Sequence, residues 1–161
     1  MNADNGKDCR TGTAKGGKTV MAFGTFDFLH AGHLHYLREA KEIAGKGGRL
    51  VVVVADDVVA EREKGHAPVN SAKDRAELVG AMKAVDAAVI GSAETAERFD
   101  VVKKYKPDLI VLGYDARENE TELMEQLRAA GMKTVPRVLR AKGYKTEINK
   151  SSALKKMLPL V

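Results

Sequence analysis

The sequence predicts an α/β fold: a Rossmann-like, doubly wound sheet of five parallel strands in a single domain. Apolar runs typical of strands alternate with amphipathic helical patterns from residue 19 onward, and this alternation favours right-handed crossovers with helices on both faces of a parallel sheet. The run 50–55 is continuously apolar and contains four consecutive β-branched valines, as expected for an interior strand buried on both faces. A chain of 161 residues suits one core. We therefore predict one domain over 19–161, preceded by a flexible polar tail over 1–18.

Two strands and two long helices are expected in the first half of this domain. Ser71 is a suitable N-cap for the second helix, because its hydroxyl can accept a hydrogen bond from a first-turn amide. The expected strands are 19–23 and 50–55, and the expected helices are 34–44 and 72–85.

Three more strands and three more helices are expected in the second half. Pro107 ends one helix, because the residue before a proline disfavours helical geometry, and Gly131 is a good helix C-cap. Pro136 cannot donate to a strand ladder and indicates an edge strand. The expected strands are 87–91, 109–113 and 133–139, and the expected helices are 94–105, 120–130 and 151–158.

The ten residues from Gly24 to His33 join the first strand to the first helix. A glycine turn leading into a helix start brings backbone N–H groups and the positive end of the helix dipole together, which favours an anion. His30 and His33, three residues apart, add side-chain donors at the same place. The sequence therefore predicts a phosphate site made by Gly24, Thr25, Phe26, His30, Ala31, Gly32 and His33. The other histidines, His35 and His66, belong to no such group and are expected to be cap or surface residues.

A second phosphate-binding pattern is present in the tail. Residues 12–19, GTAKGGKT, match GxxxxGK[ST], but that loop binds phosphate only between a strand and a helix. Here polar residues precede the match and a strand pattern follows it, so we interpret it as a coincidence of composition.

Acidic residues follow two of the other predicted strands. Asp56 and Asp57 come after 50–55, and Asp115 comes after 109–113. Ligands of such sheets bind beyond the carboxyl ends of the strands, at the point where the strand order reverses. We expect these carboxylates to lie near the histidines, although Asp115 is equally a turn residue and Asp56 equally a cap for 58–64.

The stretch GTFDFLHAGH resembles the GTFDxLHxGH signature of the nucleotidyltransferases related to the cytidylyltransferases, and the resemblance covers about 19–158. Lys64-Gly65, Pro68 and Arg75 resemble the family's KGxxP…R segment. Leu112 to Asp115 resembles its nucleotide-recognition turn. Residues 145–152 are similar to its RTEGIST element, with lysine in place of arginine and the serines shifted by one residue.

Within this family the chain is most similar to the archaeal-type FAD synthetases, which share its Lys142–Lys145 segment and paired serines. The resemblance implies transfer of AMP from ATP to FMN, giving FAD and pyrophosphate. Glycerol-3-phosphate cytidylyltransferases and heptose-phosphate adenylyltransferases are alternatives with the same in-line mechanism. A nucleotide sensor that retains the fold is the non-enzymatic alternative, although it would not need both histidines.

The resemblance also implies roles for individual residues. His30 and His33 would be catalytic, holding the phosphates through the transition state with the amides of Thr25 and Phe26. The nucleotide would be contacted by Asp115 and Tyr144, and a phosphate by Ser151 and Ser152, where Ser151 is equally readable as an N-cap. Mg²⁺ would bridge the triphosphate, with water and phosphate oxygens as its main ligands. Asp56, Lys64 and Arg75 form a second group of candidates, and both cations are equally readable as surface charges.

Composition limits the remaining classes of function. The net charge is +5, and basic residues alternate with acidic ones rather than forming a stripe, so we expect no nucleic-acid partner. No apolar run approaches the roughly 20 residues of a membrane span, and no signal-peptide core is visible. Cys9 is the only cysteine, which suits a reducing cytoplasm. A homodimer is expected because the family commonly dimerises.

Overall fold

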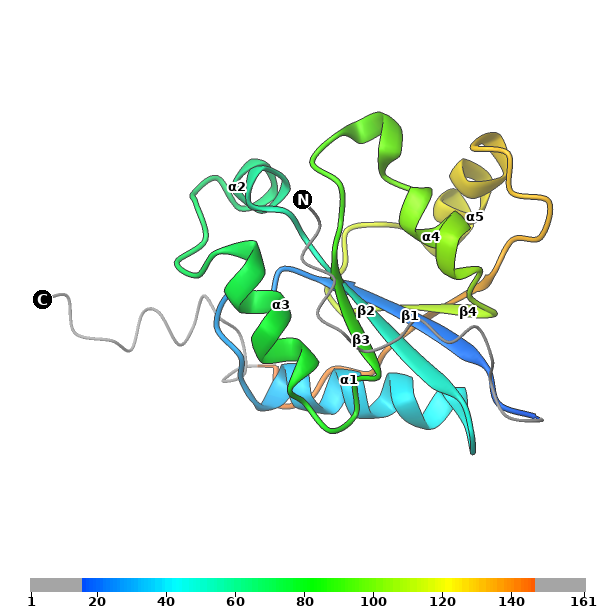
Figure 1. Ribbon diagram of the computed structural model, residues 1–161, viewed down its shortest axis with the longest axis horizontal. Helices are drawn as coiled ribbons and strands as arrows, with labels where there is room; N and C mark the ends of the chain where they lie inside the picture. The colour runs from blue at the N-terminus through cyan, green and yellow to red at the C-terminus, as the bar shows by residue number, and fades with distance from the viewer. Residues whose placement is uncertain (1–15, 147–161) are drawn as a thin grey trace, which may run out of the picture.

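The computed structural model describes residues 16–146 and shows one five-stranded sheet with every neighbouring pair of strands parallel. The strand order is β3-β2-β1-β4-β5, which confirms the predicted doubly wound α/β fold (Figure 1). The strands are β1 (Thr19–Gly24), β2 (Arg49–Val54), β3 (Ala87–Ile90), β4 (Leu109–Leu112) and β5 (Arg137–Arg140).

Helices cover both faces of this sheet. They are α1 (Ala31–Ala44), α2 (Asp57–Lys64), α3 (Ala72–Gly80), the short 3₁₀ helix η1 (Thr95–Glu97), α4 (Asp100–Tyr105) and α5 (Glu120–Ala129). Helices α1 and α3 pack against one face, and α4 and α5 pack against the other (Figure 1).

Alternate residues of each central strand supply the two halves of the core. In β2, Leu50 and Val52 face the α1 side while Val51 faces the α4 side, and all three are fully buried. Burial on both faces is what the β-branched run predicted for an interior strand.

The strand order reverses between β1 and β4. The chain runs from β1 outward to β3 and then returns to place β4 against the other side of β1. A crevice beyond the carboxyl ends of these two strands is the expected ligand position in such a sheet. The residues that follow β1 and β4 are therefore the expected ligand-binding residues.

Two expected helices differ from the observed ones near their starts. Helix α1 begins at Ala31 rather than Leu34, because the Nδ1 atom of His30 accepts a hydrogen bond from the Gly32 amide and caps the helix. The expected helix 94–105 is divided into η1 and α4. The Ser92 hydroxyl bonds the Glu94 amide and the Glu97 carboxylate, which stabilises a local turn instead.

Two further predictions were wrong: the C-terminal end of one helix and the position of the last strand. The expected helix 72–85 ends at Gly80, a weak helix former, and the chain turns so that Val85 enters the core. The strand expected over 133–139 is Arg137–Arg140. It is an edge strand as predicted, but Pro136 precedes it and does not interrupt its ladder. The helix expected over 151–158 lies outside the described residues.

No helix in the part of the chain that the structure describes has the length and apolar character needed to cross a membrane.

Candidate active site

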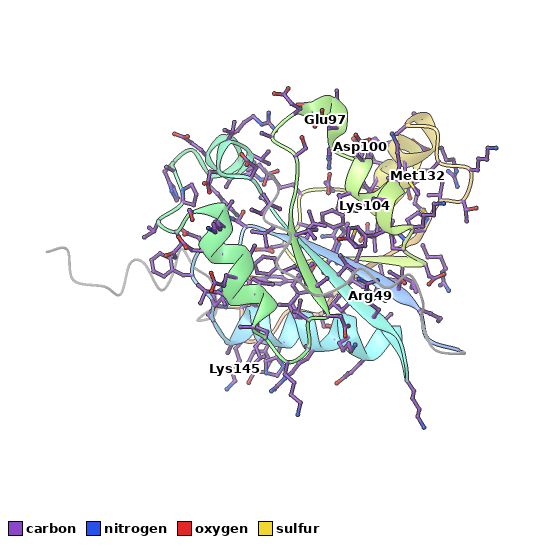
Figure 2. The ribbon with its side chains drawn as sticks, in the orientation of Figure 1. Arg49, Glu97, Asp100, Lys104, Met132 and Lys145 are labelled. Carbon is purple, nitrogen blue, oxygen red and sulfur yellow. The ribbon has the colours of Figure 1, made fainter. Side chains whose placement is uncertain are left out.

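A cavity of about 800 Å³ opens at the carboxyl edge of the sheet. Its walls come from the turn after β1, the start of α1, helix α2, the segments 91–99 and 113–118, and residues 141–144. Figure 2 shows Glu97, within the segment 91–99, and Lys145, beside residues 141–144, on opposite sides of the sheet. The predicted site residues Gly24, Thr25, Phe26, His30, Gly32, His33, Asp56, Lys64, Asp115 and Tyr144 all line the cavity.

His30 and His33 form a stacked pair at the start of α1. Their ring centroids are 3.9 Å apart with an interplanar angle of 26°. Because Nδ1 of His30 accepts the Gly32 amide, a neutral His30 ring carries its proton on Nε2. That nitrogen is then a donor, as a phosphate oxygen requires.

Burial keeps both imidazoles neutral. It lowers the pKa of His33 to about 4, helped by the charge that His30 carries when protonated, while the Phe28 carbonyl acts in the opposite direction. Burial also lowers the pKa of His30, partly offset by the Asp115 carboxylate. Neutral rings at pH 7 cost little to bury, and they can donate hydrogen bonds to an incoming anion.

Phe26 belongs to the turn after β1, and its ring contacts His33. Its backbone has φ of 55°, in the left-handed region that is uncommon for a residue with a side chain. The ring contacts His33 edge-on, with centroids 5.1 Å apart at 61°, and stacks on Tyr36 at 6.5 Å. The preceding Gly24 must be small, because a Cβ there would lie 2.7 Å from the Phe26 ring.

Tyr36 is a site residue that the sequence reasoning missed. Its buried hydroxyl donates to the Val111 carbonyl at 2.6 Å and accepts from the Phe23 amide at 3.2 Å, so it joins β1 to β4 where the strand order reverses. Its position, three residues after His33 on the inner side of α1, was the available signal.

The acidic candidates occupy different places. Asp115 follows β4 and lies close enough to His30 to influence its pKa, as expected. Asp56 caps α2, with its carboxylate accepting from the Val58 amide at 2.9 Å, and it also lines the cavity. Asp57 lies outside the cavity lining and pairs with Arg75 at 2.6 Å.

Two predicted contacts need correction. Arg75 does not line the cavity: its side chain is 0% exposed and lies behind the turn 24–27. The alternative of a solvated surface charge is equally wrong. Ala31 also lies outside the lining, because it begins α1 with its side chain exposed. Lys64, at the end of α2, does face the cavity.

Tyr144 forms part of the cavity wall next to α1. Its ring stacks on His35, with centroids 3.4 Å apart and an angle of 16°, so His35 has a partner that its isolated position in the sequence did not predict. The Lys142 amide also donates to the Glu39 carboxylate at 3.1 Å, which ties the segment to α1. Ser151 and Ser152 lie outside the described residues.

Arg140 braces the turn that carries Asp115 and was also missed. Its guanidinium donates to the carbonyls of Gly113 at 3.2 Å, Ala116 at 2.9 Å and Glu118 at 2.6 Å. It also bonds the Glu120 carboxylate at 2.7 Å. The neighbours of Arg140 in the sequence do not indicate these bonds, because its partners Gly113 and Glu118 are 27 and 22 residues away.

The half of the cavity toward α4 and α5 is apolar at its base and charged at its rim. Buried or half-buried side chains form the base: Phe23, Val53, Phe99, Val102, Ile110, Leu112 and Leu123. Charged side chains of both signs surround it: Arg62, Glu63, Lys64, Glu94, Arg98, Arg117 and Glu118. Arg98 pairs with Glu118. Such a compartment suits an aromatic group attached to a phosphate.

Within residues 16–146, no group of three or more His, Cys, Asp or Glu side chains is arranged to hold a metal ion. Around the histidines lie Lys64 and backbone amides, which suit phosphate oxygens, and the carboxylates of Asp56 and Asp115, which belong to no group of three metal ligands. The residues present therefore fit a metal that arrives on a triphosphate.

The structure also bears on the GxxxxGK[ST] match. Its final residues Lys18 and Thr19 lead directly into β1, at the amino end of the strand. The Lys18 amide bonds the Ala44 carbonyl there at 3.0 Å. Since a strand follows instead of a helix, and the cavity lies at the opposite edge of the sheet, the rejection of this motif is confirmed for its described part.

Residues 21–157 match the sequence model of the family described as cytidylyltransferase-like. This chain belongs to the cytidylyltransferase-like family. Among cytidylyltransferase-like relatives, a protein named FAD synthase from Thermococcus sibiricus is 40% identical over 136 residues, covering 84% of this chain and 88% of its own. A FAD synthase from Thermoplasma volcanium is 40% identical over 139 residues, covering 86% and 92%.

A solved structure agrees with the fold of this family member. The lipopolysaccharide core biosynthesis protein from Thermoplasma volcanium aligns with a TM-score of 0.72 and 38% identity, covering 81% of this chain and 100% of that one. The resemblance deduced from the signature, to this family and to its archaeal FAD synthetase branch, is thereby confirmed.

Proposed function

We propose that this protein is an FMN adenylyltransferase, or FAD synthase, which transfers AMP from ATP to FMN and releases pyrophosphate. The observation that carries this function is a family signature whose two histidines lie in one cavity with the turn after β4. The archaeal relatives that cover most of this chain and bear the name FAD synthase support the choice of acceptor.

The chemistry needs no protein nucleophile. An oxygen of the FMN phosphate forms a bond to the α-phosphorus of ATP, and the bond from that phosphorus to the bridging oxygen breaks as pyrophosphate leaves with the electron pair. Catalysis then depends on alignment of the two substrates and on stabilisation of the charge that develops on the α-phosphate.

His30 and His33 would provide that stabilisation. Both are neutral donors at pH 7 when the cavity is empty, and a bound triphosphate raises their pKa by adding negative charge nearby. The amides of Thr25 and Phe26 and the positive end of α1 would supply further donors. Ser151 and Ser152 remain proposed phosphate ligands by family resemblance.

The two halves of the cavity suit the two substrates. Asp115 and Tyr144 lie with the histidines and would contact the adenosine moiety, while the apolar base beside Phe99 would receive the isoalloxazine ring. Lys64 lies at the rim between them and would bind phosphate. Asp56 serves chiefly as the cap of α2 in this proposal.

Mg²⁺ would be held by the triphosphate and water, because residues 16–146 offer no ligand cluster. When bound, it neutralises phosphate charge and favours departure of pyrophosphate. Homodimer formation, cytoplasmic location and the absence of nucleic-acid binding stay predictions of the sequence.

The decisive experiment follows FAD by chromatography with the purified protein, Mg²⁺, ATP and FMN. Riboflavin is the matched control acceptor, since it carries the same ring without the attacking phosphate, and it should give no product. A parallel reaction contains CTP and glycerol 3-phosphate. Product only in the parallel reaction would support a glycerol-3-phosphate cytidylyltransferase, and binding without product in either would support a nucleotide sensor.

A further inference from the structure

Arg75 is the largest fully buried side chain in the described part of the protein, and it donates to three separate segments. Its Nη1 bonds the Thr25 carbonyl at 2.5 Å, its Nε bonds the Asn70 carbonyl at 2.9 Å, and its Nη2 bonds the Asp57 carboxylate at 2.6 Å. Only the bond to Asp57 belongs to an ion pair, and the other two hold backbone carbonyls. The planar guanidinium fork, with donors in fixed directions, is what allows all three.

A second connection ties the same turn to the same loop. One carboxylate oxygen of Asp27 accepts the amides of Val69 and Asn70 at 2.9 and 3.0 Å. The Asn70 side chain returns a bond to the Asp27 carbonyl at 2.7 Å. The residues on both sides of Phe26 are therefore anchored, Thr25 to Arg75 of α3 and Asp27 to the segment that precedes α3.

Phe26 is the residue that these anchors hold. Its left-handed backbone, with φ of 55°, is sparsely populated and persists only where surrounding contacts enforce it. Phe26 as a whole is 2% exposed, and its ring meets His33 edge-on with the centroids 5.1 Å apart. A shift of the Thr25 carbonyl would therefore move the adjacent residue Phe26, and the Phe26 ring would in turn change its contact with the His33 imidazole.

We propose that Arg75 is a positioning residue for the nucleotidyl transfer, which holds the Thr25–Phe26 turn in the left-handed conformation that seats the Phe26 ring against His33. Thr25 and Phe26 line the cavity, so the same clamp would align their amides, the proposed phosphate donors, with the histidine. The kinetic part of this inference rests on the proposed function, while its conformational part does not.

The test uses Arg75→Lys in the full chain, with Val79→Ala as the matched control. Lysine keeps the charge and the bond to Asp57 but loses the fork. Val79 lies one turn further along α3 and is fully buried, so its truncation destabilises the same helix without touching the turn. The measurements are kcat, KM for ATP, the urea midpoint, and the pKa of His33 by NMR titration.

We expect Arg75→Lys to lower kcat by about 10²-fold, the scale of a misalignment of about 1 Å, with KM for ATP changed less than about threefold. The pKa of His33 should rise from about 4 toward 6.5, because the released ring exposes the imidazole to water. Val79→Ala should shift the urea midpoint while leaving kcat and the pKa of His33 unchanged.

The proposal is wrong if Arg75→Lys behaves like Val79→Ala, or if kcat and the pKa of His33 do not move together. Should Arg75→Lys fail to fold, Arg75→Gln decides the matter by the same two readouts, because glutamine buries no charge and still cannot bond all three segments. If the wild-type protein makes no FAD, the proposed function fails, and the His33 titration alone still decides whether Arg75 holds the turn.

Discussion

The Tyr36 hydroxyl donates a 2.6 Å hydrogen bond to the Val111 carbonyl, which links α1 to β4 underneath the cavity. Tyr36→Phe removes this donor and leaves a buried carbonyl without it, so the free energy of unfolding should fall by about 1–3 kcal/mol. Urea unfolding followed by circular dichroism measures the loss. A change below about 0.5 kcal/mol would show that water replaces the hydroxyl.

His33 carries the largest expected effect on turnover. Because its imidazole would stabilise charge on the α-phosphate, His33→Ala should reduce kcat by roughly 10²–10³-fold. The fold should stay intact, which an unchanged circular dichroism spectrum would establish. An activity loss below about tenfold would remove His33 from the catalytic role.

Acid should destabilise the protein through the same residue. The pKa of His33 is about 4 in the folded chain against an ordinary value of 6.5. Between these values the unfolded chain binds a proton that the folded chain does not, so the free energy of unfolding falls as pH falls from 6.5 toward 4. The contribution is at most about 1.4 kcal/mol per pH unit. In His33→Gln the dependence of the urea midpoint on pH should be correspondingly shallower in this range and parallel to wild type above pH 7.

Asp115 should matter for nucleotide binding. Its carboxylate lies beside His30 in the cavity, and Asp115→Ala should weaken ATP binding by about 1.5–3 kcal/mol, the value of a charge-assisted hydrogen bond. Isothermal titration measures this directly. The pKa of His30 should fall further in the same variant, because the carboxylate that raises it is gone; equal ATP affinity in both proteins would leave Asp115 as a turn residue only.

The N-terminal tail should be dispensable. Deletion of residues 1–17 should leave ATP binding and turnover nearly unchanged, because β1 begins at Thr19 and the cavity lies at the other end of that strand. Lys18→Ala, which removes the lysine of the GxxxxGK[ST] match, is the companion variant. Loss of ATP binding in either protein would revive the rejected motif.

Local patterns were sufficient to predict most of the fold and the centre of the site. The apolar, valine-rich run 50–55 indicated an interior strand, since a strand buried on both faces is typically apolar at every position. The turn from Gly24 to His33 indicated a phosphate site, because a strand end, a glycine and a helix start lie within ten residues of one another. These conclusions depend on neighbours in the sequence. The structure confirms the interior strand and brings most residues of the turn to one cavity, and phosphate binding there stays a prediction.

Tertiary structure alone decided which distant residues support that turn. Arg75 resembled a phosphate ligand, but burial behind the turn gives it the Thr25 carbonyl, 50 residues away, as a partner. Tyr36 and Arg140 were invisible as site residues, because their partners Val111 and Gly113 are 75 and 27 residues away. A sequence shows the hydrogen-bonding capacity of a side chain, but a buried donor selects its acceptor only after the sheet and helices have packed, since desolvation then penalises every donor left unpaired.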